Sequence, residues 1–345
     1  MCRRMKKKVF LFGVVFFCAV LLAGCGREQT GTNSGEESSD IKKETAELFA
    51  MDTIIEITVY DKAPSRLLEE ARELVDFYEN LFSVNVEDSD VAKLNRAAGK
   101  PVTVSEETWR LIETSMQLAE RTEGLFDISV YPLVRAWGFT TEEYRVPGEK
   151  ERKQICRNID VGKIQLQSDN TICLPEQMQI DLGGIAKGYV SQKLVEYFRD
   201  NGAAAAVISL GGNVQTFGTK PDGTPFTVGI TNPADGSSVY GTIEIGEKAV
   251  ITSGSYQRFF ERDGRTYHHI MDKRTGAPAE SDLRSVTVLS DNGECADALA
   301  TALFIMGREK AVAFDKNNDD IQCILIDNDN KVWTSEGLEL KQMDE

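Results

Sequence analysis

The chain has 345 residues, of which 41% are hydrophobic and 27% charged, a composition typical of a folded globular protein with one large domain or two smaller ones. Its formal net charge of −16, without a basic stripe interleaved with aromatic residues, argues against nucleic-acid binding. An anionic ligand would therefore need local positive charge, from a metal ion or a lysine, to offset the field of the whole protein.

Residues 1–24 have the pattern of an export signal. They carry five basic residues and no acidic one, and the apolar run 9–23 is short for a spanning helix but normal for a signal core. Their removal would lower the formal charge from −16 to −21. The Leu-Ala-Gly-Cys sequence at 22–25 resembles the bacterial lipobox, which implies cleavage before Cys25 and a lipid on its thiol; an uncleaved anchor is the alternative. We therefore expect a lipid-anchored protein on the extracytoplasmic side of the cell membrane.

Residues 25–45 are mostly small, polar or charged, so we expect a lipidated flexible tether before one folded domain over 46–345, with structure from near Leu48. Alternating and helical spacings of apolar residues predict the first elements of that domain. In chain order these are a strand at 53–60, a helix at 67–81, a short helix within 88–95, a helix from the N-cap Ser105 to about Arg121, and an irregular or short helical stretch at 128–139.

The second half of the chain is predicted to be mostly strands, separated by glycine and Asp/Asn turns. A helix with Val190, Leu194 and Phe198 on one face precedes these strands. The strands are expected at 205–210, 226–231, 241–245, 249–252, 266–271 and 285–290, followed by helices at 296–306 and 309–314 and a hairpin of 321–326 with 332–334. Because helices and strands do not alternate strictly, we expect an α+β fold with mixed or antiparallel sheets flanked by helices.

Four of the seven cysteines would remain in the domain, at Cys156, Cys173, Cys295 and Cys323, with no C-x-x-C or zinc-site spacing. Cys295 and Cys323 fall in apolar segments, so we expect buried thiols. Cys156 and Cys173 can form a disulfide or remain free thiols, because an exported protein can be oxidised.

Residues 181–188, Asp-Leu-Gly-Gly-Ile-Ala-Lys-Gly, form the most informative motif. A strand-like run at 179–180 enters it and a helical pattern leaves it. Its small residues bring backbone N–H and C=O groups close to a polar ligand, while Asp181 can accept hydrogen bonds and Lys187 can face an anion. The motif matches neither a P-loop nor a dinucleotide-binding fingerprint. The alternative is a tight turn that needs glycine only for its backbone geometry.

Asp297 and Thr301 are four residues apart on a predicted helix, so both oxygens lie on one face. A carboxylate and a hydroxyl in this arrangement suit Mg²⁺, which binds oxygen ligands and keeps several waters. The alternative is a carboxylate near the helix start that interacts with the helix dipole, and a threonine that bonds to its own i−4 carbonyl.

Both histidines of the chain are adjacent, at 268 and 269, on a predicted strand whose side chains point to opposite faces. One of them can therefore serve a site as a general base, and an exposed edge-strand position is the alternative. The Gly/Ser turns at 209–213 and 252–255 can donate N–H groups to phosphate, or be ordinary turns.

Together these segments resemble the ApbE family, the FAD:protein FMN transferases. The resemblance follows the family's order over nearly all of residues 48–310. It rests on the segments at 50–53, 82–83, 124–127, 132–133, 137–138, 181–188, 209–213, 252–254, 269–270, 272–276 and 296–303. It implies one catalytic domain over 46–345 that uses Mg²⁺ and FAD, attaches FMN through its phosphate to a Thr or Ser of an acceptor protein, and releases AMP. The acceptors implied are flavoprotein subunits of membrane redox complexes and other exported proteins.

The resemblance also implies roles for individual residues. It implies FAD binding by Met51, Asn85, Leu125, Phe126, Asp127, Asp181, Lys187 and Ile270. It implies Mg²⁺ binding by the carbonyl of Ala186 with Asp297 and Thr301, and catalysis by Asp297 with His269 as the base.

One position departs from the family pattern, because many members carry a tyrosine where this chain has Asn85. An asparagine cannot stack on the nucleotide, so water could replace the acceptor hydroxyl. An FAD pyrophosphatase that releases FMN and AMP is therefore an alternative function, and a non-catalytic flavin-binding lipoprotein is another.

Overall fold

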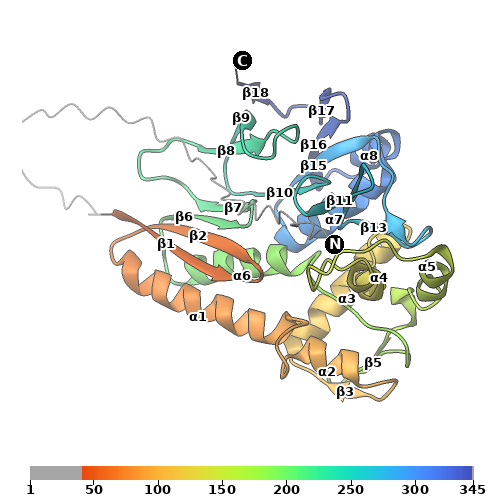
Figure 1. The fold of residues 1–345 in the computed structure, drawn as a ribbon. Coiled ribbons are helices and arrows are strands. Elements are labelled where there is room, and N and C mark those ends of the chain that lie inside the picture. The colour runs from red at the N-terminus through yellow and green to blue at the C-terminus, as the bar shows by residue number, and fades with distance from the viewer. Residues whose placement is uncertain (1–40, 344–345) are drawn as a thin grey trace, which may run out of the picture.

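The computed structural model describes residues 41–343, so the expected signal segment, the Cys25 lipidation site and most of the expected tether lie outside the described residues. Its centre is an eight-stranded sheet in which each pair of neighbouring strands is antiparallel (Figure 1). The strands, in spatial order, are β1 (Lys42–Ala50), β2 (Thr53–Asp61), β6 (Ala205–Leu210), β7 (Asn213–Gly218), β10 (Ala249–Gly254), β15 (Leu283–Ser290), β16 (Ile321–Asp327) and β17 (Val332–Thr334).

Four helices pack on the strands of this sheet in nearly the same order as the strands themselves. They are α1 (Pro64–Phe82) on β1 and β2, α6 (Ala186–Asp200) on β6 and β7, α7 (Gly293–Met306) on β10 and β15, and α8 (Arg308–Lys316) on β16. The described helices include none that combines the length and apolarity needed to cross a bilayer.

A second sheet, with the order β18 (Lys341–Gln342), β9 (Val239–Ile245) and β8 (Phe226–Thr231), covers the other face of the main sheet. Alternate residues of one strand therefore enter different cores. Ile251 of β10 packs with the helices, whereas Val250 packs with β8 and β9. Burial on both faces explains why these strands are almost continuously apolar in sequence.

Shorter elements close one end of the main sheet. They are α2 (Asp90–Arg96), β3 (Val102–Thr103), α3 (Glu106–Arg121), η1 (Ile128–Val130), α4 (Tyr131–Ala136), α5 (Glu149–Cys156), η2 (Val161–Lys163), β4 (Gln165–Leu166), β5 (Thr171–Cys173), β11 (Phe259–Arg262), β12 (Arg265–His268), β13 (Met271–Asp272) and β14 (Ala277–Pro278). Trp137, Phe139 and Phe260 form a buried cluster here, and the Trp137 indole donates to the carbonyl of Gly276 at 2.9 Å. This contact holds the loop around 272–276 against α4.

The α+β fold with antiparallel sheets and flanking helices is confirmed, as are most of the expected elements. The predicted N-cap is also present, since the Ser105 hydroxyl accepts from the N–H of Thr108 at 3.1 Å. The hairpin of β16 and β17 forms as expected.

Several local predictions were wrong. The first described strand starts at Lys42, ahead of the start expected near Leu48, because the polar strand β1 pairs with β2 along its whole length and needs apolar residues on only one face. Residues 179–180 form no strand: the side-chain amide of Asn95 binds both backbone groups of Ile180, at 2.7 and 2.8 Å, in place of a partner strand.

The strand expected at 266–271 is split, because β12 ends at His268 and His269 lies in a bend before β13. Strand β7 was missed because the two glycines before it suggested a loop.

The four described cysteines are free thiols, so Cys156 and Cys173 do not pair. Cys323 is buried as expected, whereas Cys295 is half-buried.

Candidate active site

The segment 181–188 folds back on itself at the start of α6. The Gly183 N–H donates to the Asp181 carboxylate at 2.8 Å, and the Lys187 ammonium donates to the carbonyl of Gly183 at 3.1 Å. The Asp181 N–H donates to the carbonyl of Ile128 at 2.9 Å, which places the segment beside residues 126–128. A Cβ on Gly184 would lie only 3.3 Å from the Phe126 ring, so glycine permits this close packing.

The starts of α6 and α7 touch through two glycines. A Cβ on Gly188 would lie 2.1 Å from the carbonyl oxygen of Gly293, and one on Gly293 would lie 2.5 Å from the Gly188 oxygen. No side chain fits between these backbones. The contact brings the Gly188 N–H within 2.9 Å of a carboxylate oxygen of Asp297 on α7.

Asp297 is a buried carboxylate, 4% exposed, with neutral hydrogen-bond donors. Its second oxygen accepts from the Asn213 side chain at 3.0 Å, and among residues 41–343 no cationic group lies within ion-pair distance of it. A buried charge without a cation is costly. A bound cation would offset that cost, so this arrangement fits a metal site.

The neighbouring donors fit the same cation. Thr301 lies one turn further along α7, with its hydroxyl 3.1 Å from that of Ser253, and Ala186 is the first residue of α6. A carboxylate, a hydroxyl and a carbonyl are the oxygen donors that Mg²⁺ prefers. In the part of the chain that the structure describes, no three His, Cys, Asp or Glu side chains gather into a metal site, so a cation here would bind the single Asp297 carboxylate together with hydroxyl and backbone oxygens.

Titratable groups around Lys187 make a local positive region. Burial lowers the pKa of His269 well below its usual range, and the nearby positive charge of Arg258 lowers it further. Burial raises the pKa of Asp181, opposed by the Gly183 N–H and by the charges of Arg258 and Lys187. The positive charges of Arg258 and Lys187 therefore both lie close to Asp181 and His269. In a chain of net charge −16, this local positive charge favours binding of an anion beside these residues.

The ring of His269 is held by the backbone of residue 258. Its Nδ1 lies 3.2 Å from the Arg258 carbonyl oxygen, which also accepts the His269 N–H at 3.1 Å. Because a carbonyl only accepts, Nδ1 carries the proton and Nε2 keeps a free lone pair. His268 instead bonds to the carbonyl of Ala279 and leaves its Nδ1 buried without a partner. Of the two histidines, His269 is therefore the candidate base.

Met51 sits in a strained turn between β1 and β2. Met51 and Asp52 both have a positive φ, 52° and 58°, in a region that non-glycine residues rarely adopt. The Met51 N–H donates to the Glu79 carboxylate at 3.0 Å, which holds the turn against α1. The charge of Asp52 contributes to the raised pKa of Asp181, so the turn lies near the 181–188 segment. Strain of this kind is often kept at functional sites.

The other residues expected to bind FAD differ in how far their side chains are exposed to solvent. Leu125 is half-buried, whereas Phe126 and Ile270 are each 4% exposed and belong to the core, so little of either side chain is open to a ligand. Asn85 is exposed at the end of α1, and its N–H donates to the Ser83 hydroxyl at 3.2 Å.

Sequence reasoning missed Arg258 and Glu79, which act through contacts with residues far away in the chain. It predicted 209–213 only as a turn that can donate N–H groups to phosphate. The structure shows Gly211 and Gly212 closing the hairpin of β6 and β7, both with positive φ, while the Asn213 side chain orients Asp297.

The ApbE family model matches residues 51–325. The chain belongs to the ApbE family. Similar curated proteins are both named FAD:protein FMN transferase: one from Klebsiella pneumoniae is 33% identical over 82% of this chain and 88% of its own length, and one from Treponema pallidum is 33% identical over 83% and 85%.

Solved structures agree with this membership. The ApbE protein of Thermotoga maritima has a TM-score of 0.81 and 32% identity, covering 86% of this chain and 97% of that one. The flavin transferase ApbE of Vibrio cholerae has a TM-score of 0.77 and 29% identity, covering 86% and 98%. The resemblance noted in the sequence and the fold that it implied are both confirmed.

Proposed function

We propose that this ApbE-family chain is a Mg²⁺-dependent FAD:protein FMN transferase. It moves FMN from FAD to a Thr or Ser hydroxyl of an acceptor protein and releases AMP. The observation that carries the proposal is the buried Asp297 carboxylate near the starts of α6 and α7. Two neutral groups, the Gly188 N–H and the Asn213 side chain, donate to it, and no cationic group among residues 41–343 pairs with it. The names of the similar proteins support the flavin chemistry.

Different residues of the proposed site bind the metal ion, bind the phosphates and accept the proton. Asp297, Thr301 and the carbonyl of Ala186 would hold Mg²⁺, which when bound supplies charge withdrawal at the FAD diphosphate. Lys187 and Arg258 attract the anionic substrate and hold its phosphates. The free Nε2 of His269 takes the proton from the acceptor hydroxyl as its oxygen attacks the FMN phosphorus, and AMP leaves with the electrons of the broken P–O bond.

Mass spectrometry tests the transfer. The soluble part of the chain from residue 26, FAD, Mg²⁺ and a candidate exported acceptor are incubated together. The proposal predicts an acceptor Thr or Ser that gains FMN, with one AMP released per FMN attached. Intact FAD after incubation with Mg²⁺ and every acceptor tried would instead indicate a flavin-binding protein without catalysis.

Hydrolysis of FAD is the second candidate function, and the exposed Asn85 favours it because an asparagine side chain cannot stack on the nucleotide as an aromatic ring would. The chain is incubated with FAD and Mg²⁺ alone. Rapid AMP release without an acceptor would indicate a pyrophosphatase, and no release would indicate strict transfer. Asn85→Tyr should lower any such hydrolysis while leaving transfer unchanged.

His269→Ala should lower kcat for transfer by roughly 10²–10⁴-fold, the usual contribution of a general base, and leave the Kd for FAD unchanged. His268→Gln is the matched control and should keep the wild-type rate, because that ring faces Phe304 and Ala279. Transfer at the wild-type rate by His269→Ala would assign the base to another group.

The same histidine predicts a pH dependence. Since burial lowers its pKa in the folded state, the folded site keeps it neutral well below pH 6.5. The kcat profile should therefore lack an acidic limb near pH 6.5. The unfolded chain binds this proton first as pH falls, so stability should decrease as pH drops below about 6.5. An acidic limb near 6.5 that disappears in His269→Ala would contradict the lowered pKa.

We also propose that Cys25 carries a lipid that anchors the chain on the extracytoplasmic side of the membrane, where exported flavoprotein subunits of redox complexes are its acceptors. The lipobox pattern and the short apolar run before it support this. Cys25→Ala removes both the lipid and the cleavage point, so it should abolish labelling by a radioactive fatty acid and leave residues 1–24 attached, which mass spectrometry would detect. Labelling that persists in this variant would contradict lipidation at Cys25.

A further inference from the structure

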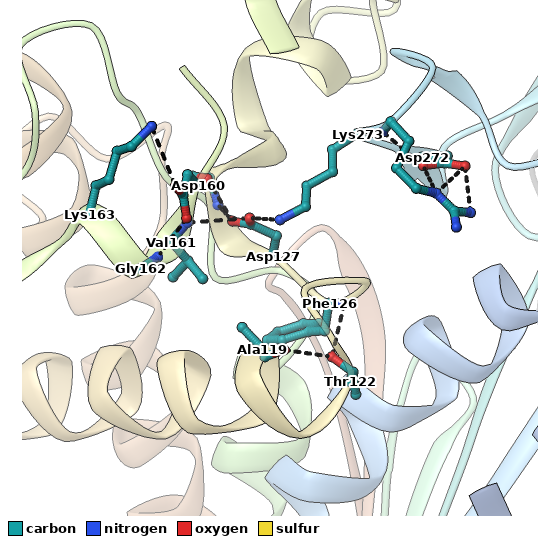
Figure 2. A network of polar contacts seen from close by, with 12 residues as sticks. Ala119, Thr122, Phe126, Asp127, Asp160, Val161, Gly162, Lys163, Asp272 and Lys273 are labelled. Carbon is teal, nitrogen blue, oxygen red and sulfur yellow. Dashed lines mark hydrogen bonds and ion pairs between the residues drawn. The ribbon is translucent and has the colours of Figure 1, made fainter. Parts of the chain in front are cut away.

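The carboxylate of Asp127 is fully occupied by the protein itself (Figure 2). One oxygen accepts from the N–H and the hydroxyl of Ser129, at 2.9 and 2.6 Å. The other accepts from the Lys273 ammonium at 2.7 Å and from the N–H of Val161 at 3.3 Å. A carboxylate has about four acceptor positions, so none is left for a ligand.

Lys273 reaches this carboxylate from a rigid turn. Gly276 closes that turn by donating to the Asp272 carbonyl at 2.8 Å, and the Asp272 carboxylate is taken by Arg274. Lys273 is therefore directed away from its neighbours toward Asp127. Its side chain is 24% exposed, against 0% for that of Asp127, and a Cβ on Gly124 would touch the Lys273 ammonium at 3.0 Å.

The ion pair joins two loops that the proposed site needs. Residues 124–127 carry Leu125 and Phe126, and residues 269–276 carry His269 and Ile270. Lys273 and Asp127 are 146 residues apart in the chain, and their ion pair links the two loops directly. Their separation sets the distance between groups that would line the FAD site and the candidate base.

We infer that Lys273 and Asp127 are positioning residues for FAD, and that Asp127 acts by holding Lys273 rather than by touching the ligand. This rests on the proposed function. Removing Lys273 leaves the fully buried Asp127 carboxylate uncompensated, and removing Asp127 leaves the Lys273 ammonium without its partner, so either change displaces the loops. Removing both leaves no stranded charge, so the two changes are not additive.

The test is a double-mutant cycle on FAD binding, measured by quenching of flavin fluorescence, with kcat and the melting temperature of the ligand-free protein recorded alongside. Lys273→Met and Asp127→Asn should each raise the Kd and KM for FAD about tenfold, with kcat changed less than threefold. The double variant should bind no worse than either single variant. Lys273→Arg should recover most of the affinity, because it keeps the charge.

Lys341→Met is the matched control, because it removes the exposed ion pair with Glu244 and should leave the Kd unchanged. A Kd for Lys273→Met equal to the wild-type value would overturn the inference, even with a lowered melting temperature. Fully additive effects in the double variant would also overturn it, since they would show that each residue acts on FAD independently. Failure of the wild-type chain to bind FAD would instead overturn the proposed function.

Discussion

Asp297→Asn should abolish FMN transfer, with kcat falling by roughly 10³-fold or more, because several kcal/mol of charge stabilisation at the diphosphate are lost with the metal. Asparagine has the shape of aspartate but no charge. It keeps one acceptor for the Gly188 N–H or the Asn213 side chain, so the surrounding backbone is expected to stay in place.

Stability separates this loss from unfolding. In the wild-type chain, Mg²⁺ should raise the melting temperature, because a ligand that binds only the folded state stabilises it. In Asp297→Asn, the ligand-free melting temperature should change little, since removal of an unpaired buried charge offsets the lost hydrogen bond. The rise with Mg²⁺ should disappear.

Asp90→Asn is the matched control. Asp90 is also a buried carboxylate, 7% exposed, and accepts from the Ser105 N–H and the Thr108 hydroxyl, but it lies on α2 and, unlike Asp297, has a lysine ammonium, that of Lys93, at 3.9 Å. It should keep the Mg²⁺ effect and the transfer activity. Near-normal activity of Asp297→Asn at low Mg²⁺ would contradict the metal assignment.

Gly188→Ala should cost about 3 kcal/mol of folding stability and reduce transfer by about 10²-fold. The added methyl would lie 2.1 Å from a carbonyl oxygen and 2.8 Å from the Asp297 Cβ. Both neighbours are rigid backbone or short side chain, so α6 and α7 must separate. That movement displaces Ala186, Asp297 and Thr301 relative to one another, which is why activity falls together with stability.

Gly246→Ala provides the comparison, because a Cβ there meets nothing within 4 Å and the residue has no positive φ. Its melting temperature and activity should match the wild type. Equal melting temperatures for Gly188→Ala and the wild type would show that the two helices do not need this contact.

Elements with strong periodicity could be predicted from the sequence. Val190, Leu194 and Phe198 are each fully buried on one face of α6, as their four-residue spacing indicated. The same spacing placed Asp297 and Thr301 on one helix face. Local patterns of this kind need no knowledge of the tertiary structure.

The missed side-chain contacts join residues that are not neighbours in the sequence. Nothing near Arg258 in the sequence indicates that its carbonyl holds the His269 ring. Nothing near Asp127 indicates that Lys273 fills its last acceptor position. Asn95 replaces a strand partner for Ile180 from 85 residues away. Side-chain contacts of this type follow from the assembled fold, so single-sequence patterns do not contain them.

The most direct test of the central claim is a crystal structure of the chain with FAD and Mn²⁺, in which anomalous scattering locates the ion. We predict that the ion binds an Asp297 carboxylate oxygen, the Thr301 hydroxyl and the Ala186 carbonyl, and also contacts the FAD diphosphate. An ordered FAD whose diphosphate lies away from Asp297, with the ion bound elsewhere, would contradict it.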